Sequence, residues 1–147
     1  MIISHAADRL AKAIVMATNS PSDPRTLAVW GQTAGVSRGA LRVWCAAARL
    51  PARSCLDFVR ILRAVILART QPWDLFSTLD IVDRRSLVRL LDRGGVRELS
   101  NSAKPPTVDE FMRIQRFLTN PEVIEAVSKR LSESANEPQT LKTTIGG

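Results

Sequence analysis

The sequence predicts an all-α fold in which two helix-turn-helix subdomains are joined by a long linker helix. Apolar residues recur about every 3.6 positions along most of the chain, and the alternation typical of strands is absent. Short turn signals separate these periodic segments. In addition, residues 36–50 recur in degenerate form at 82–96, which indicates two similar units.

The first two helices are expected on either side of a short turn. Residues 4–18 place their apolar side chains on one face, which is typical of a helix packed on a core. The turn spans 19–24, where Asp23 is positioned to cap a helix that begins at Pro24. Proline suits this first position because it lacks only an N–H that has no helical partner there. We expect this helix to end near Thr33.

Two more helices are expected after Gly35. This glycine breaks the second helix, and Ser37 is positioned to cap a third over about 38–48. Pro51 then opens a long helix that we expect to continue to about Arg69. Its apolar residues turned toward the core are Leu56, Val59, Leu62 and Ile66.

The second half of the chain contains shorter helices. Pro72 opens one, and Asp83 is positioned to cap another that ends at Gly94. The spacing of TVDE at 107–110 is that of a capping box, so helices resume there. The expected organisation is a folded domain at 1–98, a linker at 99–106, C-terminal helices at 107–131 and a disordered tail at 132–147.

Residues 31–44, GQTAGVSRGALRVW, match a helix-turn-helix. Gly31 allows the second helix to cross the first closely, and Gly35 tolerates the positive φ of a tight turn. The residues expected to face the core are Trp30, Val36, Leu41 and Trp44. The exposed side of the second helix then suits a DNA major groove, where arginine binds guanine edges or phosphates. The candidate DNA-binding residues of this unit are Ser37, Arg38, Gly39 and Arg42.

A shift of 46 residues aligns this unit with a second one. The shift pairs the caps Ser37 and Asp83, and it pairs Trp30 with Phe76. Ile81 stands where the turn glycine is expected, so the second copy is degenerate. Its candidate DNA-binding residues, for which we expect phosphate contacts above all, are Arg84, Arg85 and Arg89.

These two units resemble the AraC-type DNA-binding domain of bacterial transcription regulators. Residues 26–41, TLAVWGQTAGVSRGAL, are similar to the family's first helix-turn-helix, and residues 49–64, RLPARSCLDFVRILRA, to its linker helix. The resemblance covers about residues 5–97. It implies two helix-turn-helix subdomains that both bind the major groove, and a role in promoter regulation. The chain departs from the family at Val43, where an arginine is usual, and at the second turn, which lacks the glycine.

The charge of the chain is consistent with a polyanionic partner. The formal net charge is +7, and residues 1–97 hold 15 Lys and Arg against 7 Asp and Glu, a net charge of +8. Seventeen of the 21 basic residues are arginine, whose planar fork matches phosphates and guanine edges. The segment predicted to fold is therefore also the basic one, and double-stranded DNA is the expected partner.

Other function classes lack their characteristic residues. Cys45 and Cys55 do not have metal-ligand spacing, and His5 is the only histidine. We find no phosphate loop or paired nucleophile and base, so we expect neither enzymatic activity nor a cofactor or metal. No apolar run approaches the roughly 18 residues of a membrane span. We therefore expect a cytoplasmic protein with reduced thiols and no membrane association.

Residues 107–131 are amphipathic and need an apolar surface to fold against, because so short a segment is marginal alone in water. That surface belongs either to the rest of this chain or to a second copy, and we expect a homodimer through 107–131. The leading hypothesis is a sequence-specific DNA-binding transcription regulator. The alternative is a protein-interaction module that reuses a degenerate helix-turn-helix pair, with 107–131 as its contact surface.

Overall fold

The computed structural model describes residues 2–135, and all regular secondary structure within this range is helical. This agrees with the all-α prediction. The helices are α1 His5–Thr18, α2 Leu27–Ala34, α3 Arg38–Ala47, α4 Ala52–Leu67, α5 Leu75–Thr78, α6 Arg84–Arg93, the 3-10 helix η1 Arg97–Asn101, α7 Val108–Ile114 and α8 Pro121–Ala135.

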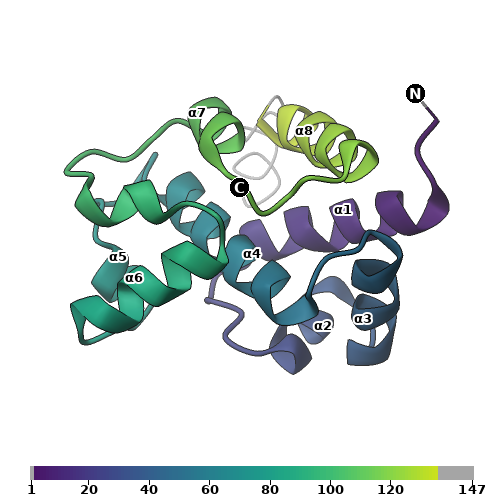
Figure 1. The fold of residues 1–147 in the computed structure, drawn as a ribbon, viewed down its shortest axis with the longest axis horizontal. Helices are drawn as coiled ribbons and strands as arrows, with labels where there is room; N and C mark the ends of the chain where they lie inside the picture. Colours follow the sequence, from purple (N-terminus) through teal and green to yellow (C-terminus); the bar gives the residue numbers. More distant parts are fainter. Residues whose placement is uncertain (1, 136–147) are drawn as a thin grey trace, which may run out of the picture.

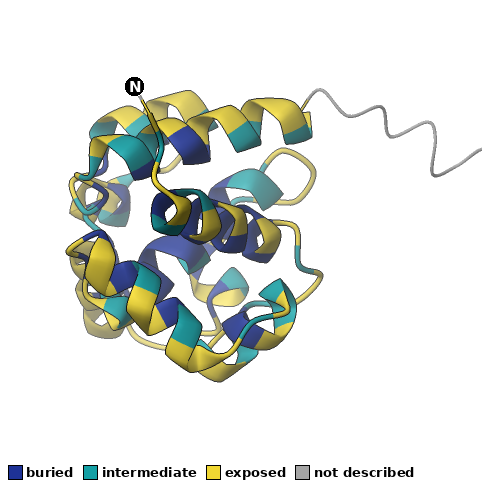
Figure 2. Ribbon diagram, turned by 90° about the vertical axis from the view of Figure 1, so that its right-hand side faces the viewer, coloured by how far each residue is buried: buried dark blue, intermediate teal, exposed yellow. Residues whose placement is uncertain are grey.

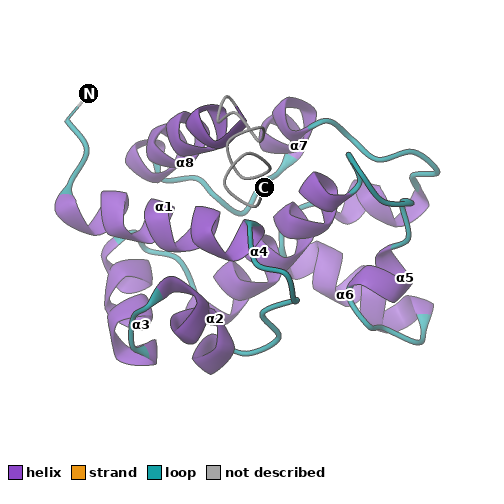
Figure 3. Ribbon diagram, turned by 180° about the vertical axis from the view of Figure 1, so that it is seen from behind, coloured by secondary structure: helices purple, strands orange, loops and turns teal. Residues whose placement is uncertain are grey.

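The helices surround α4. Figure 1 shows α2 and α3 near one end of α4 and α5 and α6 near the other, with α7 and α8 on the opposite side of the molecule. The view from behind shows the same arrangement, with α1 beside α4 at the centre (Figure 3). The exposed sides of α3 and α6 are consequently not covered by the C-terminal helices.

One hydrophobic core holds these elements together. Its largest fully buried side chains include Trp30 of α2, Phe58 of α4 and Phe111 of α7, and residues of η1 and α8 belong to the same cluster. In Figure 2 the buried faces of the helices turn toward the centre and the exposed faces outward. The apolar stripes visible in the sequence therefore meet in a single core, which drives folding by removing them from water.

The start of α2 differs from the prediction. The helix begins at Leu27, with Thr26 as its cap, rather than at Pro24. Asp23 caps no helix, because its carboxylate binds the Arg60 guanidinium of α4 at 2.8 Å. Both of these side chains are about nine-tenths buried, so the aspartate serves a long-range ion pair in place of a local cap.

Arg60 of α4 binds both the segment before α2 and the segment after α5. Besides Asp23, which precedes α2, it donates a hydrogen bond to the carbonyl oxygen of Leu79, which follows α5. Arg93 of α6 binds the buried carboxylate of Asp57 at 2.7 Å. These contacts fix the positions of the α2–α3 and α5–α6 pairs relative to each other.

The C-terminal helices pack on their own chain, which is one of the two surfaces considered from the sequence. Val123 and Val127 of α8 are fully buried, and α8 lies along α1. Arg130 of α8 also binds Asp8 of α1 at 2.9 Å. The apolar face of 107–131 is thus covered within the chain, and a homodimer through this segment stays a prediction.

The limits of this region also differ from those expected. The predicted linker, 99–106, begins within the helix η1 (Arg97–Asn101), whose Leu99 is buried. Helix α8 continues to Ala135, so residues 132–135 are helical and not part of a tail. The remainder of the predicted tail, 136–147, lies outside the described residues.

Candidate nucleic-acid interface

A tight turn joins α2 to α3. Gly35 ends α2 with a φ of +69°, as its lack of a side chain predicts, and the N–H of Val36 donates to the carbonyl of Gly31 at 2.8 Å. Ser37 caps α3 by accepting from the N–H of Ala40 at 3.0 Å. A Cβ built on Gly31 would lie 2.6 Å from the oxygen of Val36, so the two helices approach this closely only because residue 31 is glycine.

The buried side of α3 includes the residues predicted to face the core, and Cys45 in addition. Leu41 and Cys45 are fully buried, whereas Trp44 is only half-buried and Val36 likewise. Spacings of three and four residues from Leu41 lead to Cys45 and Ala48, and all three lie on one face. The thiol of Cys45 is therefore the fully buried group at the end of α3, and Trp44 packs against the edge of the core.

All the candidate residues of the first unit are exposed, but they occupy two different parts of the α3 surface. Gly39 and Val43 lie opposite the buried face, and the Val43 side chain is 64% exposed. Arg38 and Arg42 lie at its flank, on the side that borders α4. The outermost surface of α3 is therefore small and apolar, with the arginines beside it.

The second unit closes its turn without glycine. Asp80 adopts the left-handed conformation, with a φ of +51°, and the N–H of Ile81 donates to the carbonyl of Phe76 at 2.9 Å. The left-handed residue thus comes one position earlier than the 46-residue shift predicts. The matching of Trp30 with Phe76 was wrong for the same reason, since Leu75 and Leu79 are the buried residues and Phe76 is exposed.

From the cap onward the two units follow the predicted shift. Asp83 caps α6 by accepting from the N–H of Ser86 at 2.8 Å. Beyond α3 and α6, the corresponding residues Arg49 and Gly95 have φ values of +60° and +77°. Each is followed by a buried apolar residue, Leu50 or Val96. The repeat noticed in the sequence is therefore a repeat of backbone conformation.

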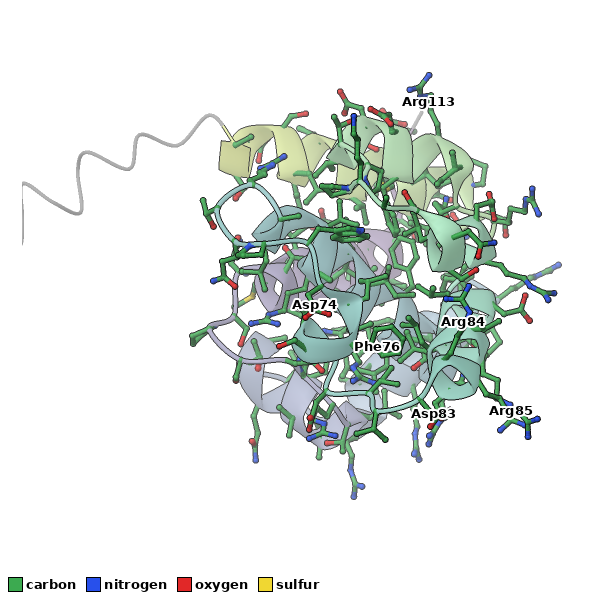
Figure 4. The ribbon with its side chains drawn as sticks, turned by 90° about the vertical axis from the view of Figure 1, so that its left-hand side faces the viewer. Asp74, Phe76, Asp83, Arg84, Arg85 and Arg113 are labelled. Carbon is green, nitrogen blue, oxygen red and sulfur yellow. The ribbon has the colours of Figure 1, made fainter. Side chains whose placement is uncertain are left out.

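The three candidate arginines of α6 differ in how they contact the rest of the protein. Arg84 donates hydrogen bonds to the carbonyl of Ser100 and the side chain of Asn101 in η1, at 3.1 and 2.6 Å. Arg85 and Arg89 lie opposite the buried face of α6, and Figure 4 shows Arg85 projecting away from the body of the protein. The two-arginine surface of α6 is thus the counterpart of the apolar surface of α3.

The electrostatics at the start of α6 favour an ionised cap. The N–H and hydroxyl of Ser86 hold the pKa of Asp83 below its usual value, and the positive charges of Arg85 and Arg89 act in the same direction. The carboxylate and the helix N-terminus therefore stabilise each other at neutral pH.

A concave surface lies between the two units. Its cavity, of about 330 Å³, is bordered by residues of α2, α3, α4 and α6. Six arginines line it: Arg25, Arg38, Arg42, Arg53, Arg60 and Arg93. Of these six arginines, the sequence indicated only Arg38 and Arg42 as binding residues. The other four come from separate elements that no local pattern brings together.

The two cysteines form a buried pair away from the candidate interface residues. Cys45 and Cys55 are free and buried, and a hydrogen bond between the thiols raises the pKa of Cys55 and lowers that of Cys45. Among residues 2–135 there is no group of histidine, cysteine and carboxylate side chains that could hold a metal, and no helix long and apolar enough to cross a membrane.

Comparisons with protein-family models, with curated proteins and with solved structures found no match for this chain. The candidate interface consists of two similar helix pairs, an exposed face on α3 and on α6, and an arginine-lined cavity between them.

Proposed function

We propose that this protein is a sequence-specific DNA-binding transcription regulator, in which α2–α3 and α5–α6 are two helix-turn-helix units and α3 and α6 enter the DNA major groove. The observation that supports this most strongly is the repeated pair of capped helices, each with a fully exposed outer face, on a basic body. An AraC-like architecture, with α4 as the linker helix, is part of the same proposal.

The spacing of the two units suits the repeat of DNA. Helix α4 has 16 residues, which at 1.5 Å per residue corresponds to about 24 Å. With the width of the helices packed at its ends, this separation is of the order of one turn of DNA, about 34 Å. The contact of Arg60 in α4 with Leu79, and that of Arg93 in α6 with Asp57 of α4, hold the two units at this separation.

The two outer faces favour different bases. On α6, Arg85 and Arg89 offer guanidinium groups that can donate two hydrogen bonds to guanine. On α3, Gly39 allows a close approach and Val43 offers methyl groups for contact with thymine. We therefore infer a site with a guanine-containing half for α6 and a thymine-containing half for α3.

Selection from a random-sequence duplex library tests the proposal. The full chain, bound at about 0.15 M salt, is expected to enrich two short motifs at a fixed spacing. The double variant Arg85→Ala, Arg89→Ala should lose the guanine-containing motif and keep the other. Enrichment of no sequence over several rounds would contradict the proposal and favour a protein-interaction module.

In that second case the contact surface within 107–131 would be the exposed side of the segment. The apolar face of 107–131 is buried against α1 and α4, and its Phe111 and Val127 are inaccessible. No contact in residues 2–135 specifically favours a protein partner, so DNA remains the better-supported function.

A further inference from the structure

The arginine-lined cavity between α3 and α4 contains charges that the protein itself does not balance. Of its six arginines, three are paired: Arg60 with Asp23, Arg93 with Asp57, and Arg25 with Asp80, at 2.7 to 2.8 Å. The other three, Arg38, Arg42 and Arg53, have no carboxylate within 4 Å among the described residues. They are all exposed to solvent.

These unpaired arginines come from two helices that face each other across the cavity. Arg38 and Arg42 are one turn apart on the flank of α3, and Arg53 is in the first turn of α4. Three like charges on the lining of one concave surface raise its positive potential, which attracts an anion. The first turn of α2, at Thr26 to Ala28, borders the same space and adds the positive end of a helix.

The chemistry selects a phosphate group as that anion. Guanidinium groups bind phosphate oxygens with paired, charge-assisted hydrogen bonds, and three of them can surround a single tetrahedral group. A cavity of about 330 Å³ that is open to solvent admits a phosphate still attached to a larger molecule.

We propose that this cavity binds a phosphate of the DNA backbone at the point where the strand passes between the two major grooves. This inference rests on the proposed function. It assigns Arg38 and Arg42 to the phosphate and not to base edges, because they lie on the flank of α3 toward the cavity. It adds Arg53, which the sequence did not indicate. The bound phosphate thereby sets the register of the duplex between α3 and α6.

The variant Arg53→Gln tests the site, because Arg53 is not on either helix that enters a groove. The slope of the logarithm of the binding constant against the logarithm of salt concentration measures the number of phosphates contacted. We expect Arg53→Gln to reduce this slope by about one and to weaken binding similarly for all sequences. The control Arg113→Gln removes an exposed arginine on α7, on the far side of the protein (Figure 4), and should leave the slope unchanged.

The outcomes separate this inference from the function it rests on. If the wild type binds duplex DNA and Arg53→Gln has the same slope and affinity, the phosphate site is wrong and the function stands. If the wild type does not bind duplex DNA, the proposed function is wrong, and the phosphate bound in the cavity does not come from DNA. In that event inorganic phosphate should raise the melting temperature of the wild type but not of Arg53→Gln, which would identify a free phosphate as the ligand. The absence of this shift as well would overturn the site altogether.

Discussion

The predicted turn can be tested where α2 and the start of α3 approach each other at Gly31. The test compares a glycine-to-alanine substitution at this position with the same substitution at Gly39. Gly31→Ala adds a methyl group 2.6 Å from the carbonyl oxygen of Val36, whereas ordinary contacts of this kind lie at 3.4–4 Å. The obstacle is backbone, so the turn itself must move. Gly39→Ala is the matched control, since its new methyl group would be 3.8 Å from the Ser37 hydroxyl, its nearest neighbour.

The two variants are expected to differ in their free energy of unfolding because only one of them creates a steric clash. Both replace a helical glycine by alanine, which favours the helix by up to about 1 kcal/mol. Only Gly31→Ala also requires the backbone to shift, at a cost of about 1–3 kcal/mol, typical of overpacking. We therefore expect Gly39→Ala to be slightly more stable than the wild type, and Gly31→Ala to be about 1–3 kcal/mol less stable than Gly39→Ala.

Urea unfolding followed by circular dichroism measures both free energies of unfolding. In thermal melts each kcal/mol should correspond to roughly 2–4 °C for a chain of this length. If Gly31→Ala and Gly39→Ala unfold at the same urea concentration, with equal dependence on urea, then α2 and α3 do not cross at residue 31. The account of the turn would then be wrong.

Three further predictions concern the core, the α6 cap and the thiols. Phe111→Ala should lower the free energy of unfolding by about 3–5 kcal/mol, because the ring is fully buried against α4, and a loss below 1 kcal/mol in urea melts would contradict the docking of α7. Asp83→Ala should be less stable than the wild type at pH 7. Ser86 lowers the pKa of the Asp83 carboxyl in the folded state, so this difference should disappear as the pH falls below the ordinary value of 3.8, and melts that differ equally at pH 7 and pH 2.5 would refute the cap. Cys45 and Cys55 should resist alkylation in the native protein and react after unfolding, so rapid native labelling seen by mass spectrometry would contradict their burial.

The sequence predicted those features whose cause is local. Ser37, Asp83 and Thr107 cap their helices as expected, because a cap needs only a side-chain oxygen and an N–H three residues later. Gly35 likewise ends α2, since the left-handed conformation depends on the residue itself. The helical periods and most boundaries could be predicted for the same reason.

The features that depend on distant residues could not be predicted. Asp23 has the sequence context of a cap, but the guanidinium of Arg60 lies close to it only in the folded chain. Asp80 adopts a left-handed turn that an aspartate tolerates less readily than glycine, so no residue type marked it. The apolar face of 107–131 showed that a partner surface was needed, without showing that α1 and α4 supply it.

The candidate site could also be predicted only where it depends on local sequence. The exposed residues of α3 and α6 follow from helical spacing, and all seven of them lie at the surface. Their division into outer and flanking positions depends on which residues are buried, and the sequence did not indicate that Cys45 is fully buried. The cavity could not be foreseen, because Arg53 and Arg93 reach it from separate helices.

Hydroxyl-radical footprinting on the duplex obtained by selection tests the central claim most directly. If α3 and α6 occupy successive major grooves, the full chain should protect two blocks on one face of the DNA, centred about 10 base pairs apart. The double variant Arg85→Ala, Arg89→Ala should lose protection over one block only. A single short block for the wild type, or loss of both blocks together in the variant, would contradict binding through two separate units.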